Sequence, residues 1–171
     1  WLDRQATRAS SSASDSVRLA DGVHVVPEFL GNRSPFADPD ARAVIAGLGL
    51  ERDHASLVAL YIAGLTGIGY GLRQLLDRFT GDGIGITSIV ASGGAARSPL
   101  VCQILADATN VPVAVPERPE PVLLGAAMLG TVAAGHAELS DAMRLMSGGC
   151  ALYSPAGGET AATHRDRYRA F

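Results

Sequence analysis

The hydrophobic positions of this chain predict a long amphipathic helix in its first half. From Leu57 to Phe79 the apolar residues recur at helical spacing, and Asp53, just before them, favours the N-cap of a helix. We therefore expect one helix from about Asp53 to Phe79. The stripe that should face the core consists of Leu57, Tyr61, Leu65, Ile68, Leu72, Leu75, Leu76 and Phe79.

The same helix carries four glycines, Gly64, Gly67, Gly69 and Gly71. Each glycine costs about 1 kcal/mol of helix stability relative to alanine. Because a glycine has no Cβ, these positions predict that another helix or a sheet approaches the backbone closely.

Beyond this helix, short apolar runs alternate with helices. Residues 86–91 predict a buried strand, and two glycines follow it. Ser98 and Pro99 favour the N-cap and the first position of the next helix. Residues 111–115 predict a second strand, and a proline-rich turn at 116–121 leads to a small-faced helix at about 122–134. The helix that begins at Pro99 should face the core with Leu100, Val101, Ile104, Leu105 and Ala108.

The remaining segments are less regular. Residues 5–16 are small, polar and rich in serine, which predicts a surface connection or a weak helix with few buried contacts. Residues 23–29 predict an edge strand or an extended segment, because Pro27 interrupts them. Short helices are expected after Ser140 and around residues 164–171. We thus divide the chain into a connecting segment, residues 1–22, and a domain, residues 23–171.

This order of elements favours an α/β arrangement with parallel pairing of the strands. Two central strands cannot cover the apolar faces of three helices, however. Either the chain borrows strands from the rest of a larger protein, or its N-terminal residues supply strands that the pattern does not reveal.

Composition and charge exclude several classes of function. Hydrophobic residues make up 47% and charged residues 18% of the chain, as in an ordinary globular domain. The net charge is -3 and the basic residues are scattered, so we expect no nucleic-acid partner. All fourteen basic residues are arginine. The lack of lysine excludes both a lysine-containing P-loop and Schiff-base chemistry.

The two cysteines, Cys102 and Cys150, have neither metal-ligand nor disulfide spacing. We interpret them as reduced, partly buried thiols of a cytoplasmic protein. The N-terminus lacks the apolar region of a secretory signal. No apolar run is expected to have the length of a membrane span, so we expect no membrane partner.

The segment from Ile89 to Pro99 is the candidate site. A strand that ends in two glycines and leads into a capped helix lets a ligand lie against bare backbone, near free N–H groups with positive partial charge. This arrangement suits a nucleotide. The residues alone are equally compatible with a plain strand-to-helix turn that needs glycine for its geometry.

Several blocks of sequence resemble the FGGY family of carbohydrate kinases. Residues 92–100 (SGGAARSPL) are similar to the adenosine motif of that family. Residues 106–113 (ADATNVPV) and 119–130 (PEPVLLGAAMLG) resemble its downstream signature. Residues 24–38 (HVVPEFLGNRSPFAD) are similar to the G-N-R-S-P region of the pentulose kinase branch, especially D-ribulokinase-like members.

The resemblance implies an actin-like (ribonuclease H-like) ATPase fold of two domains, which transfers the γ-phosphate of Mg-ATP to a sugar hydroxyl. Carried over to this chain, Gly93, Gly94 and Ala95 would pass beside the adenosine and the α-phosphate. Ser98 would lie near the base or ribose, where related kinases often have asparagine. The small-faced helix at about 125–134 would lie near the hinge between the domains.

The resemblance also implies that this chain is an incomplete C-terminal actin-like domain, with part of its sheet missing. The phosphate loop of the family, its second phosphate motif and its catalytic aspartate have no counterpart here. We therefore expect no catalytic residue and no metal ligand in this chain, and no kinase activity from it alone. Mg2+ and the sugar would be held mainly by the missing N-terminal domain. The resemblance also allows a homodimer of the parent protein.

Other polar residues are interpreted more simply. Asn32 and Arg33 could bind an anion or the sugar, but we favour hydrogen bonds that hold a loop at the domain boundary. Arg97 is interpreted as a solvated surface residue. The four histidines show no metal-ligand spacing. The pair Glu117 and Glu120 is interpreted as loop charge, not as an acid/base pair.

Two alternative functions belong to other classes. The first is a non-catalytic actin-like module that binds nucleotide or assembles without turnover. The second is a dinucleotide-binding oxidoreductase domain. We set the second aside, because Gly93 and Gly94 lack the full G-x-G-x-x-G spacing and no acidic residue follows at the distance expected for the ribose.

Overall fold

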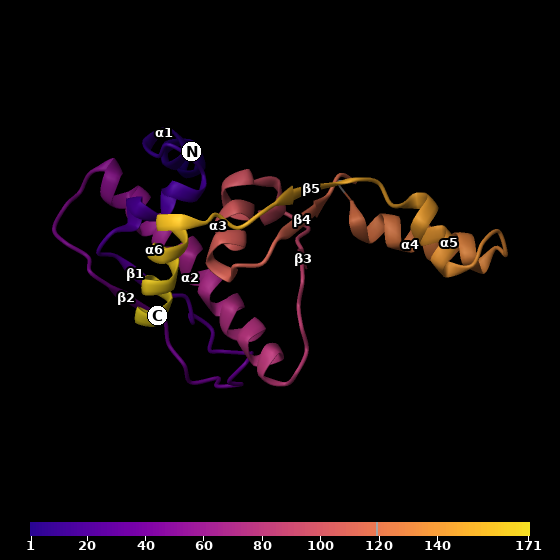
Figure 1. Cartoon of the computed structure of the whole chain (residues 1–171), viewed down its shortest axis with the longest axis horizontal. Helices are drawn as coiled ribbons and strands as arrows, with labels where there is room; N and C mark the ends of the chain where they lie inside the picture. Colours follow the sequence, from indigo (N-terminus) through magenta and orange to yellow (C-terminus); the bar gives the residue numbers. More distant parts are fainter. Residues whose placement is uncertain (119) are drawn as a thin grey trace.

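The computed structural model describes residues 1–118 and 120–171, and it shows a compact body with a helical arm that projects from it (Figure 1). Pro119, which begins one of the sequence blocks above, lies outside the described residues. In chain order the elements are α1 (Leu2–Ala9), η1 (Ser14–Ala20), β1 (His24–Val26), β2 (Val44–Ala46), α2 (His54–Gly81), β3 (Ile89–Val90), η2 (Ala95–Arg97), α3 (Pro99–Thr109), β4 (Val113–Pro116), α4 (Pro121–Ala133), α5 (Leu139–Met146), β5 (Cys150–Tyr153) and α6 (Gly158–Ala170), where η marks a 3-10 helix.

The long helix α2 is the centre of the body. Its predicted N-cap is confirmed, because a carboxylate oxygen of Asp53 accepts a hydrogen bond from the Ser56 N–H at 2.8 Å. The helix packs against η1, β1 and α3. The main core cluster gathers residues from these elements, namely Ala6, Ala20, Val25, Val58, Ile62, Ala63, Leu100 and Ile104.

The predicted inward stripe of α2 is wrong in part. Leu57 and Ile68 are 46% and 53% exposed, whereas Val58 and Ile62 are buried. Apolar residues surround much of this helix, so their spacing alone could not decide which side would face the body. The contacts with η1, β1 and α3 bury the face that includes Val58 and Ile62, each one residue after a member of the predicted stripe.

Two of the four glycines in α2 are explained by close packing. A Cβ at Gly67 would lie 2.2 Å from the carbonyl oxygen of Val25 in β1, and one at Gly69 would lie 2.6 Å from the Cβ of Ala108 in α3. These positions confirm the predicted close approach of a strand and a helix. At Gly64 and Gly71 an added Cβ would meet open space.

Residues 5–16 were expected to make few buried contacts, and within this range only Ala6 and Ser16 are buried. Val17 and Ala20, which follow it, are fully buried. The small side chains let α1 and η1 approach α2 closely. Composition alone had instead suggested a surface linker. The division of the chain at residues 22 and 23 stays a prediction.

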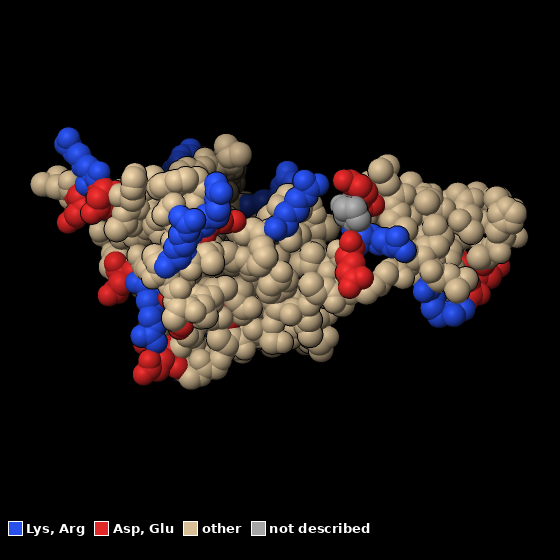
Figure 2. All heavy atoms as spheres, turned by 90° about the horizontal axis from the view of Figure 1, so that it is seen from above, with Lys and Arg blue, Asp and Glu red and all other residues tan. Residues whose placement is uncertain are grey.

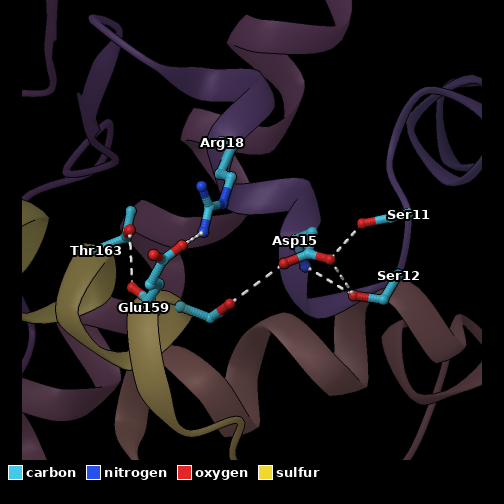
Figure 3. A network of polar contacts seen from close by, with 7 residues as sticks. Ser11, Ser12, Asp15, Arg18, Glu159 and Thr163 are labelled. Carbon is cyan, nitrogen blue, oxygen red and sulfur yellow. Dashed lines mark hydrogen bonds and ion pairs between the residues drawn. The ribbon is translucent and has the colours of Figure 1, made fainter.

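Polar contacts fasten the last helix, α6, to η1 (Figure 3). Arg18 Nη2 lies 2.8 Å from Glu159 Oε2, and Thr160 Oγ1 donates to Asp15 Oδ1 at 3.3 Å. The guanidinium of Arg167 also donates to the carbonyl oxygens of residues 20 and 23, at 3.0 and 2.6 Å. The first and last segments of the chain are therefore held together.

A small sheet carries the candidate site. Among the described residues its strand order is β3-β4-β5, with β3 parallel and β5 antiparallel to β4. Parallel pairing of β3 and β4 was predicted, and α3 connects them across one face, where Cys102, Ala106 and Val113 form a second buried cluster. The strand predicted over residues 86–91 is shorter, and its residue Val90 is 69% exposed rather than buried. Strand β5 was not predicted.

The arm consists of α4 and α5, which pack against each other beyond the sheet (Figure 1). The small face predicted for α4 is mostly exposed: only Met128 of α4 and Ala142 of α5 are buried among the described residues. The arm is joined to the body by the continuations of β4 and β5.

By length and composition, α2 could cross a membrane, so the expectation that no apolar run has that length is wrong for this helix. Core helices of globular proteins pass the same test. Here α2 is packed against η1, β1 and α3.

Candidate nucleotide-binding site

A small cavity opens where the parallel strands β3 and β4 end. Its volume is about 90 Å3. One wall is the turn that follows β3, and the other is the end of β4 with the start of α4. The lining residues are Ala91, Ser92, Gly93, Ala96, Arg97, Val115, Pro116, Arg118 and Pro121.

The two glycines of the turn differ in what the fold requires of them. Gly93 has a φ of +83°, in the left-handed region where a Cβ is strained. Gly94 has a φ of -61° and a ψ of -42°, which any residue can adopt, and an added Cβ would meet open space. The fold therefore explains Gly93, whereas Gly94 leaves bare backbone that the fold does not need.

The start of α3 lies directly beyond this turn. Ser98 Oγ accepts a hydrogen bond from the Val101 N–H at 3.2 Å, and Pro99 occupies the first helical turn, as predicted. The Ser98 hydroxyl keeps its own proton for a second hydrogen bond. A 3-10 turn, η2, precedes the helix and was not predicted. The positive end of the α3 dipole thus faces the turn that carries Gly93 and Gly94.

Beneath the turn, a buried thiol supports its backbone. The Cys102 thiol donates to the carbonyl oxygen of Ala96 at 3.6 Å, and burial raises the pKa of this thiol. It is a neutral structural group. The second cysteine, Cys150, is exposed, unlike the partly buried thiol that was expected, and both cysteines are free.

Two arginines at the cavity were not predicted to be site residues. Arg97 and Arg118 line it from opposite walls, and Arg97 lies 3.8 Å from Glu120. Both partners of that ion pair are largely exposed, so it adds little stability. The sequence did hold a signal for Arg118, because residues that follow two adjacent parallel strands meet at the same edge of a sheet.

The four residues predicted to bind the nucleotide therefore lie at or beside one cavity. Gly93 lines the cavity, Gly94 and Ala95 are exposed beside it, and Ser98 begins the adjoining helix. The cavity is smaller than the range of about 300–1,000 Å3 that is usual for small-molecule pockets. It can accommodate one part of a nucleotide, and the binding roles of these four residues stay predictions.

Comparison with known proteins decides the family. The model of the C-terminal domain of FGGY carbohydrate kinases matches residues 2–134. The chain belongs to the FGGY family of carbohydrate kinases. The family predicted from sequence blocks is thus confirmed.

Relatives of this FGGY chain include kinases and kinase domain-containing proteins. It is 36% identical to an FGGY carbohydrate kinase domain-containing protein of Danio rerio over 85% of this chain and 27% of that protein. It is 40% identical to a glycerol kinase of Rhodospirillum rubrum over 79% of this chain and 28% of that protein. The chain therefore spans about a quarter of the length of the curated relatives that it matches.

Solved FGGY kinases share the fold. A xylulose kinase from Brucella ovis matches 99% of this chain and 36% of its own with a TM-score of 0.74 and 26% identity. A Plasmodium falciparum glycerol kinase with ADP matches 99% of this chain and 34% of its own, with a TM-score of 0.71 and 25% identity. The predicted fold class is confirmed: this FGGY chain is a part of an actin-like α/β fold, with few strands.

The loop with Asn32 and Arg33 lies on a different surface. Asn32 is buried, and its side chain donates to Glu28 Oε1 at 2.7 Å and accepts from the Phe36 N–H at 3.0 Å. Its backbone N–H donates to the Asp38 carbonyl at 2.7 Å. The favoured interpretation, a loop held by hydrogen bonds, fits Asn32. The side chain of Arg33 is exposed at a shallow hollow beside it.

The buried histidine of α6 lies away from the cavity and is a structural group. His164 is buried and its Nδ1 lies 2.9 Å from the hydroxyl of Tyr70. Burial, together with the charges of Arg167 and Arg73, lowers the pKa of His164 to about 4, so it is neutral near pH 7. In the part of the chain that the structure describes, no group of three or more His, Cys, Asp or Glu is placed to hold a metal ion.

Proposed function

We propose that this chain is the ATP-binding C-terminal portion of a carbohydrate kinase, and that the whole protein phosphorylates a hydroxyl of a pentulose such as ribulose or of a related polyol. One observation carries the proposal. In a chain of the FGGY family, the turn at Gly93 and Gly94 leaves bare backbone beside a cavity, at the ends of two parallel strands and the start of a helix.

The cavity fits one end of ATP. Its apolar wall, which includes Ala91, Ala96 and Val115, offers van der Waals contact to a flat base. The open backbone of Gly94 would let the ribose or the α-phosphate lie close. Arg97 and Arg118 can donate hydrogen bonds to the oxygens of the ribose or the α-phosphate. The role of the chain is to bind and orient the nucleotide.

Phosphoryl transfer depends on positioning and on stabilising the charge of the phosphoryl group. Mg2+ would supply part of that stabilisation when bound with ATP. Among the described residues, no group of three or more His, Cys, Asp or Glu is placed to hold this ion. We assign the base that accepts the hydroxyl proton to a part of the kinase outside this chain.

The substrate class rests on the loop at residues 31–35, whose sequence (GNRSP) is similar to the pentulose kinase branch. Some of the relatives are named as glycerol kinases, and solved neighbours are named as xylulose, glycerol and gluconate kinases. The names that include xylulose and glycerol support a pentulose or a related polyol. We also propose that the protein is cytoplasmic, because both of its cysteines are free thiols.

The test is the activity of the full-length protein that contains this chain. Purified protein would be supplied with Mg-ATP and with ribulose, xylulose, glycerol and gluconate in turn, and ADP release would be followed by a coupled assay. We expect release with a pentulose or a polyol. If ATP analogues bind but no sugar causes ADP release, the protein is instead a non-catalytic actin-like module.

A further inference from the structure

A buried arginine of α6 has no acidic partner in the part of the chain that the structure describes. Arg167 is only 8% exposed, and none of the ion pairs between described residues includes it. Its two terminal nitrogens donate to the carbonyl oxygens of Ala20 and Val23, but among the described residues its Nε–H has no hydrogen-bond partner. Carbonyl dipoles offset only part of the cost of burying a charge, so an anion beside Arg167 would lower that cost further.

The position of Arg167 is unusual for an arginine of this chain. Figure 2 shows arginine side chains that project from the surface into solvent, as charged side chains usually do. Asp21 and Asp166 line a hollow together with Arg167, but both aspartates are exposed, and Asp166 pairs with Arg169 at 3.1 Å. Solvent screens the charge of these two carboxylates. They therefore do not replace a buried counterion.

Arg167 also lines a cavity between α2, α6 and the strands β1 and β2, which lie side by side at the C-terminal end of the chain (Figure 1). The volume of this cavity is about 80 Å3. One water needs about 10–15 Å3, so the space is sufficient for a small organic anion. Val44, Ala46 and Ala170 line the cavity and are exposed, so a solute can enter it from solvent.

The polar groups of this cavity are suited to an anion. His24 lines it beside Arg167. Burial and the charge of Arg167 lower the pKa of His24, so its imidazole is neutral near pH 7 and offers one N–H donor. Tyr70 contributes a hydroxyl, 2.9 Å from Nδ1 of His164. The hydroxyl of Thr66 already donates to the carbonyl oxygen of residue 62 at 3.0 Å. No lining residue is acidic.

The charge and the lining of the cavity favour a carboxylate over a phosphate. Arg167 is the only arginine that lines it, so it balances a single negative charge. A guanidinium matches the planar geometry of a carboxylate. A phosphate monoester carries a charge of about -1.5 to -2 and three acceptor oxygens. Apart from the polar side chains named above, the lining is apolar, which suits a short hydrocarbon tail.

We propose that the cavity at Arg167 binds a small monocarboxylate, with the carboxylate on Arg167 and His24 and the tail against Val44 and Ala46. This cavity shares no lining residue with the candidate nucleotide site. The proposal therefore depends neither on the nucleotide nor on the sugar. Because Arg167 also holds the carbonyl groups of residues 20 and 23, the ligand would lie where the last helix meets the first segments of the chain.

The test titrates butyrate into the full-length protein that contains this chain, at constant ionic strength, with saturation-transfer difference NMR as the readout. We expect a Kd of about 1 mM, because so small a ligand makes few contacts. Arg167→Gln should raise this Kd at least tenfold. The matched control is Arg165→Gln, because Arg165 lies on the same helix but is exposed and does not line the cavity. It should bind butyrate within threefold of the wild type.

A second variant keeps the test decisive if Arg167→Gln does not fold. Ala46→Leu retains the guanidinium and places a larger apolar side chain at the mouth of the cavity. As a substitution at an exposed position it should leave the melting temperature close to that of the wild type, while the Kd for butyrate rises at least tenfold.

Four results would overturn the proposal. The first is no binding of butyrate to the wild type, and the second is an equal Kd for the Arg167 and Arg165 variants. The third is wild-type affinity in Ala46→Leu, which would place butyrate elsewhere. The fourth is tighter binding of inorganic phosphate than of butyrate at a site that Arg167→Gln abolishes, which would assign the cavity to a different class of anion.

Discussion

At the scale of single residues, the most informative position is Gly94. Its backbone angles suit any residue, and its missing side chain leaves open space next to the cavity. Gly93, one residue earlier, has a conformation that favours glycine. The two glycines look equivalent in the sequence. The structure separates a glycine that serves the turn from one whose absence of a side chain could serve a ligand.

Replacing Gly94 with valine should therefore reduce nucleotide affinity without unfolding the chain. The branched side chain would occupy the space that we assign to the nucleotide, and we expect at least a tenfold rise in the Kd for ADP, or about 1.4 kcal/mol. Isothermal titration calorimetry would measure the Kd. Gly85→Val is the matched control, because Gly85 also faces open space, in a loop away from the cavity. Unchanged affinity in the Gly94 variant would place the nucleotide elsewhere.

His164 gives a second prediction at this scale. Its pKa is lowered to about 4 by burial and by Arg167 and Arg73, against 6.5 in an unfolded chain. Between these values the unfolded chain binds the proton and the folded chain does not, so stability falls as the pH falls. From pH 7 to pH 5 the loss should be about 2 kcal/mol.

Urea denaturation at both pH values would measure this loss. In His164→Gln most of this loss should disappear, because most carboxylates titrate below this window. A smaller loss should remain, since burial and the charge of Arg167 also lower the pKa of His24. An unchanged pH dependence in that variant would assign the effect to another group.

At the scale of elements, predictions from local sequence were correct where a side chain forms a hydrogen bond with the backbone a few residues away. Asp53 and Ser98 cap α2 and α3 as predicted. The run at residues 150–153 could not be recognised as a strand, because its partner in β4 is about forty residues away and the run has no alternation of its own. The buried face of α2 was also beyond local pattern, because apolar residues lie on both of its sides.

The glycines of α2 provide a test of element packing. Gly67→Ala should destabilise the chain by about 1–3 kcal/mol, because the added methyl would collide with the carbonyl oxygen of Val25 in β1. Gly71→Ala is its counterpart in the same helix. Its methyl meets open space, so it should stabilise the chain by about 1 kcal/mol. Thermal denaturation of both variants would check the opposite signs, and equal effects would contradict the packing.

At the scale of the whole molecule, polar contacts join some segments of the chain, whereas other segments expose apolar side chains. The first and last segments are joined by Arg18, Glu159 and Arg167 (Figure 3). Exposed apolar side chains remain on α2 (Leu57 and Ile68), on the sheet (Val90 and Leu152) and on the arm (Val122 and Leu129). The candidate site lies where the arm meets the body, so the cavity depends on residues from both.

This arrangement predicts that the 171-residue chain binds nucleotide but does not turn it over. We propose that the site at Gly93 and Gly94 orients a nucleotide, and we assign the role of base to none of its residues. A coupled assay for ADP, with Mg-ATP and each of the sugars named above, should give a rate equal to that of a blank without protein. ADP release that Gly94→Val abolishes would show that this chain contains the catalytic residues after all.

The amino-acid sequence was enough to predict the family, the caps of two helices and the position of the glycine turn, because each signal consists of residues close together in the chain. The three-dimensional structure was needed to show which face of α2 is buried, that β5 joins the sheet, and that Arg97 and Arg118 line one cavity. Those features depend on contacts between distant segments. The exposed stripe of α2 joins the two levels, since its sequence is that of a core and this chain leaves it uncovered.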